Sequence, residues 1–142
     1  MDWTLEVAVL PVSNIDRAIA FYRDQVGFVL DHDTRTEHMH VAQLTPVGSG
    51  CSIVIGDLPA QNEMAPGSMR VCNCALPTPP PPGRSCWIGA SKRARSPYST
   101  SDGGTFFGFS DLDGNTWAVQ QLTVRASKPL IPVEHRGRFG AD

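Results

Sequence analysis

The stretch Gly104-Thr-Phe-Phe-Gly-Phe-Ser-Asp-Leu-Asp-Gly-Asn-Thr-Trp-Ala-Val-Gln-Gln121 carries the strongest structural information in this chain. Before its acidic centre, Phe107 and Phe109 alternate with small residues, as the two-residue period of a β-strand requires. Residues 111–115 form a turn sequence whose Gly and Asn can adopt positive φ. Residues 116–121 alternate again. The stretch therefore predicts a β-hairpin.

The opening of the chain predicts a strand followed by a helix. Residues 5–12 form the strand, with Pro11 near its end, where a missing N–H donor does least harm. Ser13 and Asn14 can cap the helix that follows. Gly27 occupies the position of a left-handed helix terminus. Helical spacing places one apolar stripe on this segment, made of Ile15, Ala18, Ile19, Tyr22 and Val26.

Three further strands are expected from residues 28–30, 38–44 and 51–55, which gives the order β-α-β-β-β. This order, the passage over residues 11–22 and the turn at 111–115 together resemble the vicinal oxygen chelate superfamily. That superfamily holds glyoxalases, bleomycin-resistance proteins and extradiol dioxygenases. Its usual turn reads Asp-Pro-Asp-Gly-Asn, and Leu112 stands here in place of the proline.

The resemblance implies an α+β fold, in which paired βαβββ modules form a curved mixed sheet around a cup. We expect one domain over residues 1–123, made of modules 3–58 and 66–123, with residues 124–142 as a C-terminal tail. Such modules pair within one chain or are exchanged between two chains, and the sequence leaves this choice open.

Composition fits one compact domain of 142 residues with 41% apolar content, and no apolar run approaches the ~20 residues of a membrane span. The net charge of −2 gives no case for binding nucleic acid or an anionic membrane. The N-terminus lacks the features of a signal peptide, so we expect a cytoplasmic protein. The cysteines form no paired C-x-x-C set, which disfavours a zinc site; they are Cys51, Cys72, Cys74 and Cys86.

The middle of the chain does not fit the module. The second module needs a strand and a helix here, yet Pro77 and the run 79–82 forbid a helix. Reading the underlying codons one base out of frame over residues 72–96 produces a strand, an Ala/Leu/Arg helix stripe, a Gly stop and a second strand. We therefore expect the second module to be disrupted between residues 72 and 96 by a compensated frameshift, and residues 77–96 to be irregular. The alternative is a genuine Pro-rich insertion.

Superfamily enzymes hold a divalent metal with His, Glu or Gln from their first, fourth, fifth and eighth strands. By resemblance, these positions fall on Val7, within 52–54, near Val71 and on Ala118. None of these residues is a good metal ligand. The sequence therefore predicts neither a metal nor a cofactor at the usual site.

The histidines offer no catalytic arrangement. His38 and His40 share one face of a short strand, which we expect to be solvated, with the core on the opposite face. His32 lies in an acidic strand end, and His135 lies in a basic tail. The aromatic residues of the hairpin, Phe107, Phe109 and Trp117, are expected to pack in the core.

What the resemblance leaves is a cup with apolar walls and a few amide or hydroxyl groups, suited to a small organic ligand. Its expected lining is Val7, Val9, Gln43, Ser52, Thr116, Ala118 and Gln120. The sequence therefore favours a metal-free, glyoxalase-like homodimer that binds a small molecule, such as an antibiotic or a metabolite that it sequesters. Two alternatives stay open: a metal-dependent lyase, isomerase or dioxygenase, and a degenerate product of the frameshift.

Overall fold

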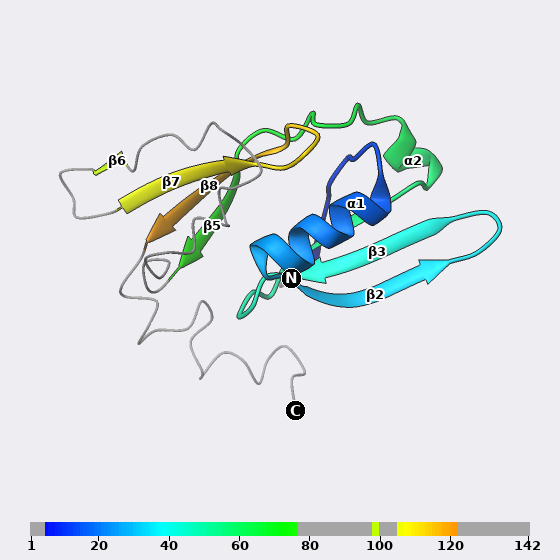
Figure 1. Ribbon diagram of the computed structural model, residues 1–142, viewed down its shortest axis with the longest axis horizontal. Coiled ribbons are helices and arrows are strands. Elements are labelled where there is room, and N and C mark those ends of the chain that lie inside the picture. Colours follow the sequence, from blue (N-terminus) through cyan, green and yellow to red (C-terminus); the bar gives the residue numbers. More distant parts are fainter. Residues whose placement is uncertain (1–4, 77–97, 100–104, 122–142) are drawn as a thin grey trace, which may run out of the picture.

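The computed structural model describes residues 5–76, 98–99 and 105–121. In Figure 1 two β-sheets lie along the long axis, and the main helix crosses the first of them. The first half contains β1 (Val7–Val9), α1 (Ile15–Ala20), the π-helix η1 (Phe21–Val26), β2 (Val29–Arg35), β3 (His40–Thr45) and β4 (Ser52–Gly56). The predicted β-α-β-β-β order is confirmed, although β1 is shorter than expected.

Local interactions explain where the helix begins and ends. The Asn14 side chain accepts a hydrogen bond from the Arg17 backbone N–H at 2.9 Å, which caps the first turn. Gly27 ends η1 with φ of 88°, in the left-handed region that glycine adopts without strain. The predicted apolar stripe faces the core, with Tyr22 fully buried. A π-helical second half replaces the expected α-helix.

The first sheet has the order β1-β4-β3-β2, with β1 parallel to β4 and the other pairs antiparallel. Its face toward α1 is apolar and buried, through Ala42, Leu44, Ile53 and Ile55. Between β2 and β3 the register shifts, because Leu30 pairs with Leu44 but His32 pairs with Gln43. Asp31 is therefore the extra residue of a β-bulge.

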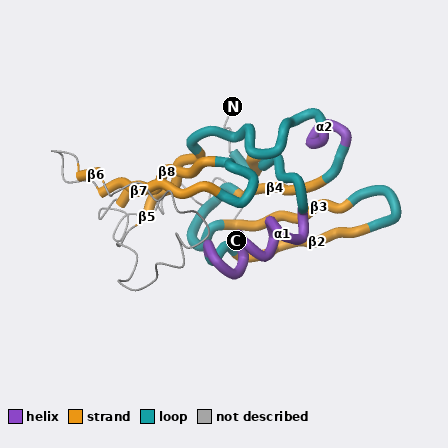
Figure 2. Tube along the Cα trace, turned by 45° about the horizontal axis from the view of Figure 1, so that its top comes forward, coloured by secondary structure: helices purple, strands orange, loops and turns teal. Residues whose placement is uncertain are grey.

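The second sheet repeats this arrangement. It contains β5 (Cys72–Leu76), β6 (Tyr98–Ser99), β7 (Thr105–Ser110) and β8 (Thr116–Gln121) in the order β5-β8-β7-β6. Its parallel pair β5–β8 corresponds to β1–β4, so the paired-module α+β fold is confirmed. The predicted hairpin is β7–β8. Figure 2 shows the loop that joins the sheets, which holds the short helix α2 (Pro59–Asn62).

Aromatic packing joins the second sheet to the helical segment of the first module in one core. Trp117 of β8 lies 5.8 Å from both Tyr22 and Phe28, measured between ring centroids. Phe109 stacks on Trp117 at 5.7 Å, and both rings are buried. The expected core role of these two residues is confirmed, whereas the side chain of Phe107 lies outside the described residues. Such pairs stabilise a core beyond their area burial by about 0.5–1.5 kcal/mol each.

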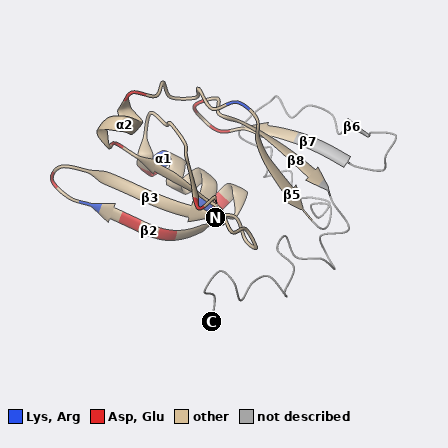
Figure 3. Ribbon diagram, turned by 180° about the vertical axis from the view of Figure 1, so that it is seen from behind, with Lys and Arg blue, Asp and Glu red and all other residues tan. Residues whose placement is uncertain are grey.

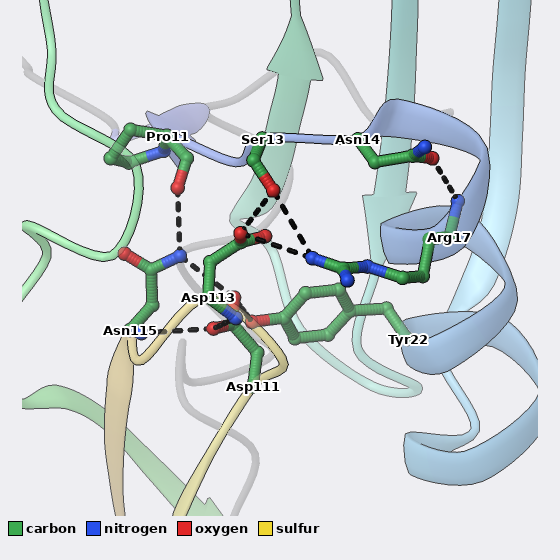
Figure 4. Close-up of polar contacts among 8 residues, drawn as sticks. All are labelled: Pro11, Ser13, Asn14, Arg17, Tyr22, Asp111, Asp113 and Asn115. Atoms are coloured by element: carbon green, nitrogen blue, oxygen red, sulfur yellow. Dashed lines mark hydrogen bonds and ion pairs between the residues drawn. The ribbon is translucent and has the colours of Figure 1, made fainter.

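The turn at 111–115 is fastened to the β1–α1 passage by buried hydrogen bonds (Figure 4). The Asp111 carboxylate accepts from the Tyr22 hydroxyl at 2.8 Å and from the Asn115 side-chain amide at 2.7 Å. The same Asn115 amide donates to the Pro11 carbonyl at 2.8 Å. The Tyr22 hydroxyl in turn accepts from the Trp117 indole N–H at 3.0 Å. Burial, followed by the nearby Asp111 charge, raises the pKa of Tyr22 well above its usual range.

Three further contacts hold the turn in place, two from the first module and one from Gly67. Arg17 pairs with Asp113 at 3.2 Å, and the Ser13 hydroxyl donates to the same carboxylate. Gly67 has φ of 74°, and a Cβ atom there would lie 2.0 Å from the Asp113 carbonyl oxygen. Only glycine fits this approach.

The predicted disruption between residues 72 and 96 falls largely on residues outside the described part of the chain. Of that segment, Cys72–Leu76 form β5 and pair in parallel with β8. The expected irregularity of 77–96 therefore stays a prediction. Within the described ranges, no helix is long and apolar enough to cross a membrane.

Candidate functional site

The predicted ligand-binding residues of the first sheet share its outer face, opposite α1. Val7 pairs with Ser52 and Val9 with Val54, so their side chains lie next to each other. Gln43 also pairs with Val54, from the other side. The alternate residues of β3 and β4 form the buried core face, which assigns the outer face without ambiguity. The structure thus brings Val7, Val9, Gln43 and Ser52 together.

The remaining predicted residues share the outer face of the second sheet. Thr116, Ala118 and Gln120 alternate with the buried Trp117 and Val119. On one side Ala118 pairs with Asn73 of β5, and on the other with Gly108 of β7. The Thr116 hydroxyl accepts from the Val71 backbone N–H at 2.8 Å. The two groups of predicted residues therefore lie on separate sheets, and the described strands of these sheets do not pair with one another.

The residues at the superfamily's metal positions do not fit a metal. Val7 and Ala118 have no lone pair, and Val71, next to the fifth-strand position, is also apolar. Ser52 engages its hydroxyl with Gln43 and Thr45. Among the described residues, no group of three or more His, Cys, Asp or Glu side chains is placed to hold a metal ion.

A hydrogen-bonded chain of polar side chains crosses the outer face of the first sheet. The Gln43 amide donates to the Ser52 hydroxyl at 3.1 Å, and the Ser52 and Thr45 hydroxyls lie 2.7 Å apart. The Thr45 hydroxyl donates to the Asp31 carboxylate. Sequence reasoning missed Thr45 and Asp31. The alternation of β3 would have placed Thr45 beside Gln43, but the bulge that presents Asp31 leaves no sequence signal.

The expected solvated face for His40 is wrong. His40 shares the buried face of β3 with Ala42 and Leu44 and is 9% exposed. Its Nε2 lies 2.7 Å from the Asp33 carboxylate, and its backbone N–H donates to Asp57 at 2.7 Å. The contact with Asp33 gives the ring nitrogen Nε2 a polar partner at the edge of the core. His38 precedes the strand and is exposed.

Acidic residues recur along β2, where the ribbon is red in Figure 3. Asp31 serves the polar chain described above, and Asp33 serves His40. Arg35 at the end of β2 pairs with Asp16 of α1 at 2.5 Å. Each of these charged residues therefore has a structural partner.

Two of the cysteines, Cys72 and Cys74, are poor nucleophiles. Burial raises the pKa of the Cys74 thiol to about 11, with smaller contributions from Cys72 and Cys51. Burial, followed by the Asp111 charge, also raises the pKa of Cys72. A thiol with a raised pKa carries little thiolate at neutral pH. These residues pack against the core instead.

Structural comparisons identify similar proteins. One is TnmS3, an antibiotic binding protein from Streptomyces sp. CB03234, with 28% identity and a TM-score of 0.69 over 84% of this chain and 96% of that one. A second is a glyoxalase/bleomycin resistance protein from the same strain, with 29% identity and a TM-score of 0.64 over 83% of this chain and 100% of that one. A member of the glyoxalase/bleomycin resistance protein/dioxygenase superfamily from Sphaerobacter thermophilus DSM 20745 is 21% identical, with a TM-score of 0.66 over 85% and 98% of the two chains.

No family model matches the sequence, and no curated protein matches it. The structural neighbours nevertheless confirm the resemblance to the glyoxalase/bleomycin resistance/dioxygenase superfamily that the sequence predicted.

Proposed function

We propose that this protein binds a small organic molecule, without a metal, on the outer faces of its two sheets. The observation that carries the proposal is the composition of the first face. Val7, Val9 and Val54 offer an apolar surface, and Gln43 lies next to Val54 with a polar carboxamide. Sites for small organic ligands combine apolar walls with a few placed polar groups in this way.

The structural neighbours support this class of function. TnmS3 is described as an antibiotic binding protein, and it matches 84% of this chain at 28% identity. A protein that sequesters a toxic molecule needs only a binding surface and no catalytic group. We therefore propose sequestration of an antibiotic or a metabolite rather than chemical conversion.

A ligand screen by thermal denaturation tests the binding. A ligand at 100 times its Kd stabilises the folded state by about 2.7 kcal/mol. We expect compounds that raise the melting temperature to lose this effect in Ala118→Glu, which puts a charge on the half-buried outer face of β8. The matched control is Ala60→Glu, on the exposed surface of α2. Equal loss in both variants, or none in either, would contradict a site on β8.

Metal analysis separates this proposal from a metal-dependent lyase, isomerase or dioxygenase. Protein incubated with Ni²⁺, Zn²⁺, Fe²⁺ or Mn²⁺ and then dialysed should retain far less than one equivalent, because Val7 and Ala118 supply no ligand atoms. One retained equivalent that disappears on substitution of Gln43 or Ser52 would favour the enzyme.

We also propose that the protein is a homodimer. β1 is an edge strand of its sheet in the described part of the chain, and Leu5, just before it, is 73% exposed. A second copy packed against β1 would cover both the unpaired strand edge and the exposed apolar side chain. Light scattering after size exclusion should give a dimer for the wild type and a monomer for Leu5→Lys. Val47→Lys, at an 82% exposed position in the β3–β4 turn, is the matched control and should stay dimeric.

A further inference from the structure

We propose that Gln43 selects ligands that carry a hydrogen-bond donor, such as a hydroxyl group, and that Asp31 imposes this selectivity through the polar chain on the outer face. The inference rests on the proposed function, since it concerns the same binding face. It follows from counting the protons that each member of the chain can donate.

The direction of every hydrogen bond in the chain is determined by its acidic end. An aspartate carboxylate only accepts, so the single hydroxyl proton of Thr45 points to Asp31. Thr45 then has no proton for Ser52, and the 2.7 Å contact between the two hydroxyls requires Ser52 to donate. Ser52 has now used its own proton and must accept from Gln43, as the 3.1 Å contact from Gln43 Nε2 shows.

The opposite orientation of the Gln43 amide conflicts with this chain. If Gln43 Oε1 faced Ser52, then Ser52 would donate to it and would need to accept from Thr45. Thr45 would then have to donate to both Ser52 and Asp31 with one proton. The carboxylate therefore determines which end of a side-chain amide faces Ser52, although Asp31 does not contact Gln43.

The result is a carbonyl oxygen presented at the binding face. Gln43 Oε1 accepts no hydrogen bond from the described part of the chain, and Gln43 is half-buried beside Val54. A ligand hydroxyl or amine can donate to this oxygen, whereas an ether or ketone oxygen has no proton to donate to it. Chains of aligned hydrogen bonds polarise one another, which strengthens the acceptor at the end.

The β-bulge is what makes the arrangement possible. Asp31 is the extra residue between the pairs Leu30–Leu44 and His32–Gln43, and it reaches Thr45 from that position. β-Bulges commonly redirect a side chain next to a functional site. The half-buried Thr45 and the buried Ser52 link Asp31 to Gln43 by hydrogen bonds across the strands.

The test compares two probes of matched size, 2-naphthol and 2-methoxynaphthalene, by isothermal titration calorimetry. We expect wild-type protein to bind 2-naphthol about three- to tenfold more tightly, the range that one net hydrogen bond provides. In Asp31→Asn, the new side-chain amide can donate to Thr45, so Thr45 can donate its own proton to Ser52. The Gln43 amide can then turn its oxygen toward Ser52. The preference should then fall to about twofold or less, and Gln43→Leu should remove it.

Asp24→Asn is the matched control, because it makes the same substitution at an exposed residue of η1 and should keep the wild-type preference. Asp31 is exposed, so Asp31→Asn is expected to fold, and its melting curve checks this. Equal binding of both probes to wild type overturns the selectivity but leaves small-molecule binding intact. A preference unchanged in Asp31→Asn overturns the role of Asp31. If neither probe binds with a Kd below about 1 mM, which corresponds to ~4 kcal/mol of binding free energy, the result counts against both the inference and the proposed function.

Discussion

Tyr22→Phe removes one oxygen atom from the centre of the molecule and keeps the aromatic ring. The Tyr22 hydroxyl donates to the Asp111 carboxylate at 2.8 Å and accepts from the Trp117 indole N–H at 3.0 Å. The side chain is fully buried, so water cannot replace either bond. The substitution therefore tests how much this junction between the two sheets contributes to stability.

The two hydrogen bonds set the expected magnitude. A hydrogen bond to a charged group contributes about 1.5–3 kcal/mol, and a buried donor left without a partner costs about 1–3 kcal/mol. The low end of the sum of these two contributions gives an expected loss of about 3 kcal/mol. For a chain of this size that corresponds to a fall of roughly 12 °C in melting temperature.

Urea unfolding followed by tryptophan fluorescence measures the loss. Ser13→Ala is the control, because it removes an exposed hydroxyl that also contacts the 111–115 turn, and it should cost no more than about 0.5 kcal/mol. Combining Tyr22→Phe with Asp111→Asn should give a loss smaller than the sum of the two single losses, since both substitutions break the same bond. A loss below about 1 kcal/mol in Tyr22→Phe would refute the view that this hydroxyl holds the sheets together.

Three other substitutions test separate parts of the fold by the same unfolding assay. Gly67→Ala should lower the free energy of unfolding by about 3 kcal/mol or more, because its Cβ would lie 2.0 Å from a backbone oxygen. The control Gly48→Ala, with nothing within 4 Å of its Cβ, should cost only the roughly 1 kcal/mol of a positive φ. Equal losses would disprove the close approach. Val71→Asn should raise the free energy of unfolding by roughly 0.5–1 kcal/mol, because Val71 has φ of 57° and Asn tolerates that region better. A lower free energy of unfolding would show that the valine is not strained. Ile19→Asp should prevent folding, since it buries a lone carboxylate, while Ala20→Asp on the exposed side of α1 should melt cooperatively; a soluble, cooperatively melting Ile19→Asp would contradict the helix face.

The sequence predicted the first module and the closing hairpin because their signals are local. The apolar spacing of the helix, its Asn14 cap and Gly27 terminus all lie within one segment of chain. Likewise, the turn at 111–115 sets the alternation of β8, so the outward positions of Thr116, Ala118 and Gln120 could be assigned. Local periodicity identifies both faces of an element.

What periodicity alone does not show is which face meets the core. For His40, the apolar Met39 and Val41 suggested the wrong face, although Ala42 and Leu44 have the parity of His40 and are buried with it. The bulge at Asp31 is a second case, since one inserted residue changes the parity of a strand without any change in composition. The polar chain was therefore invisible until strand register was known.

The bonds that fasten the 111–115 turn also carry a consequence for how the chain is synthesised. Tyr22 and Asp111 are 89 positions apart, and Pro11 and Asn115 are 104 apart. On a ribosome, the first module emerges long before the 111–115 turn is synthesised. The Tyr22 hydroxyl therefore has no hydrogen-bond partner at Asp111 until nearly all of the described chain has emerged. Contacts of such sequence separation slow folding. A nascent chain halted before Asp111 should therefore be a sensitive substrate for proteases, and release of the last hairpin should confer protection in a single step.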